Sequence, residues 1–108
     1  MNSAIIEEIT NFIDMVAKSD TILDMNRTHR KTLAAVFTDP VSGTIEWRKI
    51  EALLKAVGCQ IIEGSGSRMT VVHEGRKAAF HRPHPGKEAL RYQVRAVRDF
   101  LKLLGVTL

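Results

Sequence analysis

The chain has 108 residues, 44% of them hydrophobic and 26% charged, which fits one globular domain with a modest core. No apolar stretch is long enough to span a membrane, and the acids Glu7, Glu8 and Asp14 do not fit a secretory signal. The single cysteine, Cys59, excludes an internal disulfide, so we expect a cytoplasmic protein from a reducing compartment.

The net charge of +4 at pH 7 is unevenly distributed along the sequence. Residues 1–25 contain five acidic residues and one lysine, whereas residues 26–59 carry a net charge of +3 and residues 60–108 one of +5. A basic body attracts polyanions, and an acidic appendage often shields such a body or binds a partner. A net charge of this size is also compatible with an ordinary solvated surface.

An acidic amphipathic helix is expected near the N-terminus. Ser3 can cap it, and Ser19 and Asp20 indicate its end. Its apolar residues recur at helical spacing, and they are Ile5, Ile6, Ile9, Phe12, Ile13 and Val16. We expect residues 1–28 to form a helical extension of a main domain at residues 29–108. The apolar stripe needs a partner surface, either on the main domain or, through self-association, on a second copy of the chain.

Two further helices are predicted before the first strand. One covers residues 30–37, with Thr28 as its cap and the turn at Asp39-Pro40 as its stop. The other ends at Gly58, a residue that favours the left-handed conformation of a helix C-cap. Its predicted inner face consists of Trp47, Ile50, Leu54 and Val57.

After Gly58 the periodicity changes from helical to alternating. Three strands are predicted, at residues 60–63, 67–73 and 76–82. A proline-rich loop and a helix at about residues 89–104 follow. The core order of helix, three antiparallel strands and helix predicts an α+β fold with the helices on one face of the sheet.

Several short motifs, in this order, resemble the HicA family. They are the helix at 46–54 that leads to Gly58, the reversal Gly64-Ser65-Gly66-Ser67, the segment at 80–88, and the last helix ending at Leu104-Gly105. The resemblance covers roughly residues 44–106. It implies a fold like that of double-stranded-RNA-binding domains, activity as a messenger-RNA interferase, and silencing by a HicB antitoxin.

Position 68 departs from the family pattern. HicA toxins usually place a histidine directly after the Gly-Ser that opens the second strand, and the resemblance implies that this histidine is catalytic. Here Arg68 follows Gly66-Ser67. A guanidinium stays protonated at physiological pH, so Arg68 cannot act as a general base, although it can bind a phosphate in a bidentate manner.

A two-residue turn at Glu74-Gly75 predicts a register in which Arg68 opposes His81. Met69 and Val71 then lie under the helices, while Arg68 and His81 share the exposed face, close enough to contact one ligand. We therefore consider His81 a candidate base for a ribose hydroxyl and Arg68 an anchor for phosphate. An accidental cross-strand pair on a solvated face explains the same sequence equally well.

The remaining histidines are weaker candidates. His73 lies at the turn, where the alternation of the strand directs its side chain toward the helices, and this favours a structural role. His84 could contact a phosphate together with Lys87. His81 and His84 are spaced like weak metal ligands, but no cysteine or carboxylate completes a site. We therefore expect neither a metal nor another cofactor.

The last predicted helix carries a second basic pattern, in which bases recur at intervals of four, three and four residues beside the apolar stripe. Such a row suits the phosphate backbone of a nucleic acid, although a solvated basic face has the same pattern. The predicted RNA-binding residues are Arg82, His84, Lys87, Arg91, Arg95, Arg98 and Lys102.

Two functions from different classes follow from the sequence. In the first, the chain is a HicA-like toxin that binds messenger RNA and cleaves it as a metal-independent endoribonuclease. In the alternative, it is a non-catalytic module that binds RNA or a protein through the same surface and has lost the catalytic histidine of the family. The expected partners are messenger RNA and a HicB-like antitoxin.

Overall fold

The computed structural model describes residues 25–108, so the predicted N-terminal helix lies outside the described residues. The described elements are α2 (Arg27–Val36), α3 (Trp47–Val57), β1 (Gln60–Glu63), β2 (Arg68–His73), β3 (Arg76–His81) and α4 (Arg91–Leu103). Their order from α3 to α4 confirms the predicted α+β core of helix, three strands and helix. No helix among residues 25–108 is both long and apolar enough to cross a membrane.

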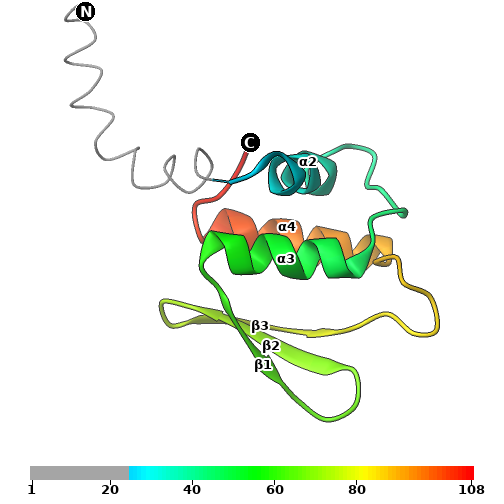
Figure 1. Cartoon of the computed structure of the whole chain (residues 1–108), viewed down its shortest axis with the longest axis vertical. Coiled ribbons are helices and arrows are strands. Elements are labelled where there is room, and N and C mark those ends of the chain that lie inside the picture. The colour runs from blue at the N-terminus through cyan, green and yellow to red at the C-terminus, as the bar shows by residue number, and fades with distance from the viewer. Residues whose placement is uncertain (1–24) are drawn as a thin grey trace, which may run out of the picture.

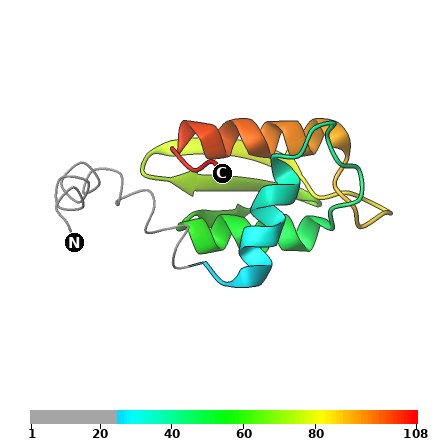
Figure 2. The ribbon, with the colours of Figure 1, turned by 90° about the horizontal axis from the view of Figure 1, so that it is seen from above.

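The elements form three layers (Figure 1). The sheet lies on one side, α3 and α4 run side by side over one of its faces, and α2 lies beyond these two helices. Viewed from above, α2 crosses over α3 and reaches α4 (Figure 2). One face of the sheet is therefore covered by helices, as predicted, while the described residues leave the other face open.

The sheet is antiparallel with the strand order β1-β2-β3. Because side chains alternate along a strand, each strand has one face toward the helices and one toward solvent. Met69 and Val71 of β2 are fully buried on the helix side, and Phe80 of β3 is 6% exposed there. This alternation confirms the predicted register of the β2–β3 hairpin.

The apolar faces of α3 and α4 complete the core. Ile50, Leu53 and Leu54 of α3 are fully buried, and so are Val94, Val97 and Leu101 of α4. Helix α3 ends at Gly58, whose φ of 108° lies in the left-handed region that favours glycine. A Cβ at this position would also approach the His73 ring to 3.2 Å, so the structure confirms Gly58 as the predicted cap.

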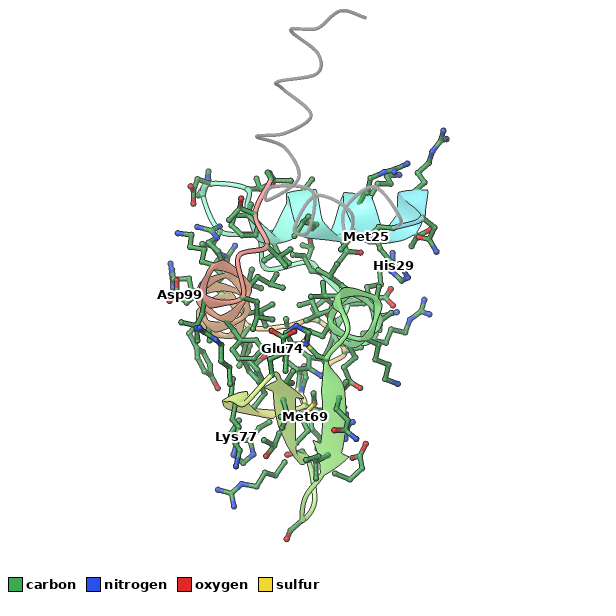
Figure 3. All side chains as sticks on the ribbon, turned by 90° about the vertical axis from the view of Figure 1, so that its left-hand side faces the viewer. Met25, His29, Met69, Glu74, Lys77 and Asp99 are labelled. Carbon is green, nitrogen blue, oxygen red and sulfur yellow. The ribbon has the colours of Figure 1, made fainter. Side chains whose placement is uncertain are left out.

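Helix α2 begins three residues before its predicted start. Its N-cap is Asn26, whose Oδ1 accepts a hydrogen bond from the His29 backbone N–H at 2.9 Å, so the prediction of Thr28 as the cap was wrong. Both residue types can cap a helix, and the sequence does not decide between them. Met25, only 4% exposed, lies between α2 and α3 and joins the core (Figure 3).

The loop between β3 and α4 is fastened to the start of α3. The Trp47 N–H donates to the carbonyl of Lys87, and the Ala89 N–H donates to the carbonyl of Ile45, both at 2.8 Å. These two bonds form a short antiparallel bridge, so residues near Ala89 are extended and α4 begins at Arg91. The loop therefore has a fixed route from the end of the sheet to the helix layer.

Candidate nucleic-acid interface

The face of the sheet away from the helices carries three cross-strand rows of side chains, defined by the register of the strands. The rows are Gly64, Arg68 and His81; Ile62, Thr70 and Ala79; and Gln60, Val72 and Lys77. Gly64 belongs to the first row because its N–H donates to the carbonyl of Arg68 at 2.9 Å. We call these nine residues the open sheet face.

The open sheet face contains no carboxylate. Its ionisable residues are Arg68, Lys77 and His81, and all three are exposed. The carboxylate of β1, Glu63, lies on the helix side, because it pairs with Met69 in the register. A face with two permanent cations and no acid attracts phosphate groups.

Arg68 and His81 oppose each other across β2 and β3, as predicted. The N–H of Arg82 donates to the carbonyl of Ser67 at 2.8 Å, so the neighbouring pair, Ser67 and Arg82, is a hydrogen-bonded pair of the ladder. Because such bonds alternate, Arg68 and His81 form a non-hydrogen-bonded pair, in which opposed Cα atoms are only about 4.5 Å apart. Their side chains therefore project from neighbouring points on the exposed face.

The reversal between β1 and β2 positions Arg68. Its N–H donates to the carbonyl of Ser65 at 3.0 Å, and its own carbonyl accepts from Gly64. A Cβ on Gly64 would lie 3.2 Å from the Arg68 Cγ and 3.2 Å from its carbonyl oxygen. The stem of Arg68 therefore packs closely over Gly64, which fixes the point from which the guanidinium extends.

A buried amide on α4 holds the backbone of His81. The Gln93 Nε2 donates to the carbonyl of His81 at 2.7 Å, and its Oε1 accepts the Leu90 N–H at 2.9 Å. Gln93 is only 4% exposed. Sequence reasoning missed this contact, for which the only signal was the inward position of Gln93 on the last helix.

Arg82 lies on the helix side of the sheet rather than on the open sheet face. Its guanidinium donates to Glu51 of α3 at 2.6 and 3.2 Å and to Glu63 of β1 at 2.7 and 2.9 Å. These bonds raise the pKa of Arg82 and hold the pKa of Glu63 below its ordinary value. The predicted phosphate ligand Arg82 therefore serves as a link between α3, β1 and the end of β3.

The four bases of α4 do not form one free row. Arg98 donates to the carbonyls of Val36 and Thr38 at 2.9 and 2.8 Å and to Asp39 at 3.0 Å, and its side chain is only 14% exposed. Arg91 is exposed and donates to the carbonyl of Val41 at 3.1 Å. Arg95 and Lys102 are exposed and make no hydrogen bond or ion pair with another described residue.

His84 and Lys87 lie in the exposed loop between β3 and α4. Lys87 approaches Glu46 to 3.8 Å, and Glu46 also accepts a 2.6 Å bond from Arg48, which lowers the Glu46 pKa. A groove of about 700 Å³ separates this loop from α3. Neither Arg68 nor His81 lines that groove, so the loop and the open sheet face present separate surfaces.

His73 is already bonded within the fold, and the cysteine Cys59 is buried. The Nδ1 of His73 lies 3.1 Å from the carbonyl of Gly58, which fits the structural role predicted for it. Burial raises the pKa of the Cys59 thiol to about 11. Within residues 25–108, no group of three or more histidine, cysteine or acidic side chains is arranged to hold a metal ion.

A family model described as the HicA toxin of bacterial toxin–antitoxin matches residues 47–106. The match runs from the first residue of α3 past the end of α4, so it includes the whole open sheet face and leaves α2 outside. Comparison with curated proteins and with solved structures returns no match.

Proposed function

This chain belongs to the HicA family of toxins from bacterial toxin–antitoxin systems, and from that premise we propose that it acts on messenger RNA through the open sheet face. One observation carries the proposal. Arg68 and His81 stand opposite each other in a non-hydrogen-bonded pair, both exposed, on a face without a carboxylate. A cation beside an imidazole combines phosphate binding with proton transfer, which are the two requirements of RNA cleavage.

In the proposed reaction, the neutral imidazole of His81 takes the proton of a ribose 2′-hydroxyl. The 2′-oxygen forms a bond to the adjacent phosphorus while the bond from phosphorus to the 5′-oxygen breaks. Water supplies the proton to the leaving 5′-oxygen, and the resulting hydroxide takes the proton held by His81. Arg68 stays protonated throughout and donates to the non-bridging phosphate oxygens, where negative charge develops.

A binding function without cleavage is the second candidate, and two observations favour it. Arg68 stands where HicA toxins usually have their histidine, and an arginine cannot serve as the base. Among the described residues, none forms a hydrogen bond with the His81 ring, so no side chain fixes its tautomer in the free protein. In this function Arg68 and Lys77 retain the RNA-binding role.

The family implies an antitoxin partner, and we propose a HicB-like protein in that role. We place both proteins in the cytoplasm, where messenger RNA is available to the toxin.

The RNA-binding part of the proposal is tested by fluorescence anisotropy with a labelled single-stranded RNA at increasing salt. The logarithm of the binding constant should fall linearly with the logarithm of the salt concentration. Arg68→Ala should weaken binding about tenfold and flatten this slope, because one phosphate contact is lost. Lys55→Ala removes one exposed charge from α3 as a control, and an equal loss in both variants would refute a specific role for Arg68.

A further inference from the structure

Lys77 lies at the far end of the open sheet face from Arg68 and His81. Figure 3 shows its side chain directed away from the helix layer, and the register places it in the third row beside Val72. We propose that Lys77 is a second phosphate contact, and that the open sheet face binds an extended single strand of RNA lying along the strands. This inference rests on the proposed function and adds the form of the RNA and its second contact.

The spacing of the rows requires a ligand with several phosphates. Lys77 and His81 are four positions apart along β3, which at about 3.3 Å per residue is about 13 Å. A single phosphate would contact both Arg68 and Lys77 only if both long side chains were stretched toward each other along the sheet. A strand with phosphates at regular intervals can contact both ends of the face.

The middle row of side chains, between the two basic ends of the face, is mostly apolar and includes one very short side chain. Ile62 is 50% exposed, Ala79 is exposed and Thr70 is partly buried. A side chain as small as Ala79 leaves room for a base to lie against the sheet, and Ile62 offers it apolar area. The Thr70 hydroxyl makes no hydrogen bond with another described residue, so it is free to bond a base edge or a ribose hydroxyl.

These dimensions favour a single strand over a duplex. Double-stranded-RNA-binding domains contact two successive minor grooves and the phosphates between them over about 16 base pairs, whereas the two basic rows of the open sheet face mark a footprint of only a few nucleotides. In a duplex the bases are also paired inside the helix, where the middle row cannot reach them. Unstacked bases of a single strand present their faces and edges to such a surface.

The test compares the binding of three RNAs. A dinucleoside monophosphate and a single-stranded hexanucleotide differ in their number of phosphates, and a blunt duplex differs from both in being double-stranded. Lys77→Gln should weaken hexanucleotide binding about fivefold and leave dinucleotide binding unchanged, because the single phosphate of the dinucleotide is held at the Arg68 end of the face. Lys55→Gln removes the same charge from α3 and should leave both affinities unchanged. The duplex should compete poorly with the hexanucleotide.

Amide NMR of the same mixtures locates the bound strand. The hexanucleotide should shift the resonances of Thr70 and Ala79, which occupy the middle row. The inference is overturned if Lys77→Gln affects no RNA or both single strands equally, or if the duplex competes as well as the hexanucleotide. Loss of binding in Arg68→Ala together with normal binding in Lys77→Gln would overturn this inference alone, whereas a wild-type protein that binds no RNA would overturn the proposed function as well.

Discussion

At the scale of single residues, the site depends on how closely Arg68 packs over Gly64. Gly64 has no side chain, and an added Cβ would approach both the stem and the carbonyl oxygen of Arg68 to 3.2 Å. The position of the guanidinium therefore depends on a residue that carries no charge.

Gly64→Ala should weaken RNA binding about threefold and lower stability by about 1 kcal/mol or less, because the new methyl group displaces the Arg68 side chain. Binding is measured by anisotropy and stability by urea unfolding. Gly86→Ala is the matched control, since a Cβ there meets nothing within 4 Å. Unchanged RNA affinity in Gly64→Ala would show that the placement of Arg68 does not matter.

The local sequence pattern predicted where some residues of the candidate site lie, but it could not predict the ion-pair partners of others. A two-residue turn and strict alternation were enough to place Arg68 and His81 on one exposed face. Arg82 and Arg98 were assigned to RNA because they are basic, but their carboxylate partners Glu51 and Asp39 lie 31 and 59 residues away in the chain. Pairs that distant arise from the packing of elements, which residue spacing does not reveal.

At the scale of elements, two arginines of α4 have different tasks although they are three residues apart. Arg98 bonds the carbonyls at the end of α2, which otherwise lack partners, and Arg95 extends into solvent. Arg98 therefore links the C-terminal end of α2 to α4, in addition to the apolar packing of the two helices.

Arg98→Ala should lower the free energy of unfolding by about 1–3 kcal/mol and leave the salt dependence of RNA binding unchanged. Arg95→Ala removes an exposed charge from the same helix and should leave stability normal, and a flatter salt slope in this variant would extend the RNA footprint from the open sheet face to α4. Urea unfolding and salt-dependent anisotropy measure the two effects in parallel. A normal unfolding free energy in Arg98→Ala combined with a flatter salt slope would show that Arg98 binds RNA instead of stabilising the fold.

The ion pair of Arg82 and Glu63 makes the joint between the end of β3 and β1 sensitive to acid. The folded state lowers the pKa of Glu63 below the ordinary value of 4.5, chiefly through its hydrogen bonds with Arg82. A carboxyl group with a lowered pKa stabilises the fold at neutral pH, and this contribution is lost as the pH falls through the folded pKa.

The urea midpoint of the wild-type protein should therefore fall as the pH is lowered through and below 4.5. Glu63→Gln should be less stable than the wild type at pH 7 and lose less stability on acidification, because its amide does not titrate. Parallel curves for the two proteins would exclude a contribution from this ion pair.

Element types were easier to predict than their ends. The apolar spacing of α3 and the alternation of β2 and β3 determine what these segments become, because each must bury one face. The ends of α2 and α4 were missed because they depend on particular hydrogen bonds. Asn26 caps the first helix, and the bridge formed by Ala89 delays the start of the second.

At the scale of the whole molecule, the charge is divided between a basic body and an acidic N-terminal segment. The described residues 25–108 contain 15 lysines and arginines and seven acids, a net charge of +8, whereas the complete chain has +4. The first 24 residues therefore lower the attraction of the chain for any polyanion.

Deleting residues 1–24 should tighten RNA binding and steepen its salt dependence, since five acids and one lysine are removed. The truncated protein should begin at Met25, which is buried in the core and has to be kept. Anisotropy measures the affinity, circular dichroism confirms folding, and sedimentation tests self-association through the removed segment. Unchanged affinity in a folded monomer would exclude shielding by this segment.

The most direct test of the central claim is a cleavage assay with a single-stranded RNA in an excess of metal chelator. The wild-type protein should release fragments that end in 2′,3′-cyclic phosphates, because in the proposed reaction His81 activates the 2′-hydroxyl and Arg68 holds the phosphate. His81→Ala should bind the RNA with an affinity within about twofold of the wild type and release no fragments. RNA that stays intact at protein concentrations that saturate it, or full cleavage by His81→Ala, would contradict this account.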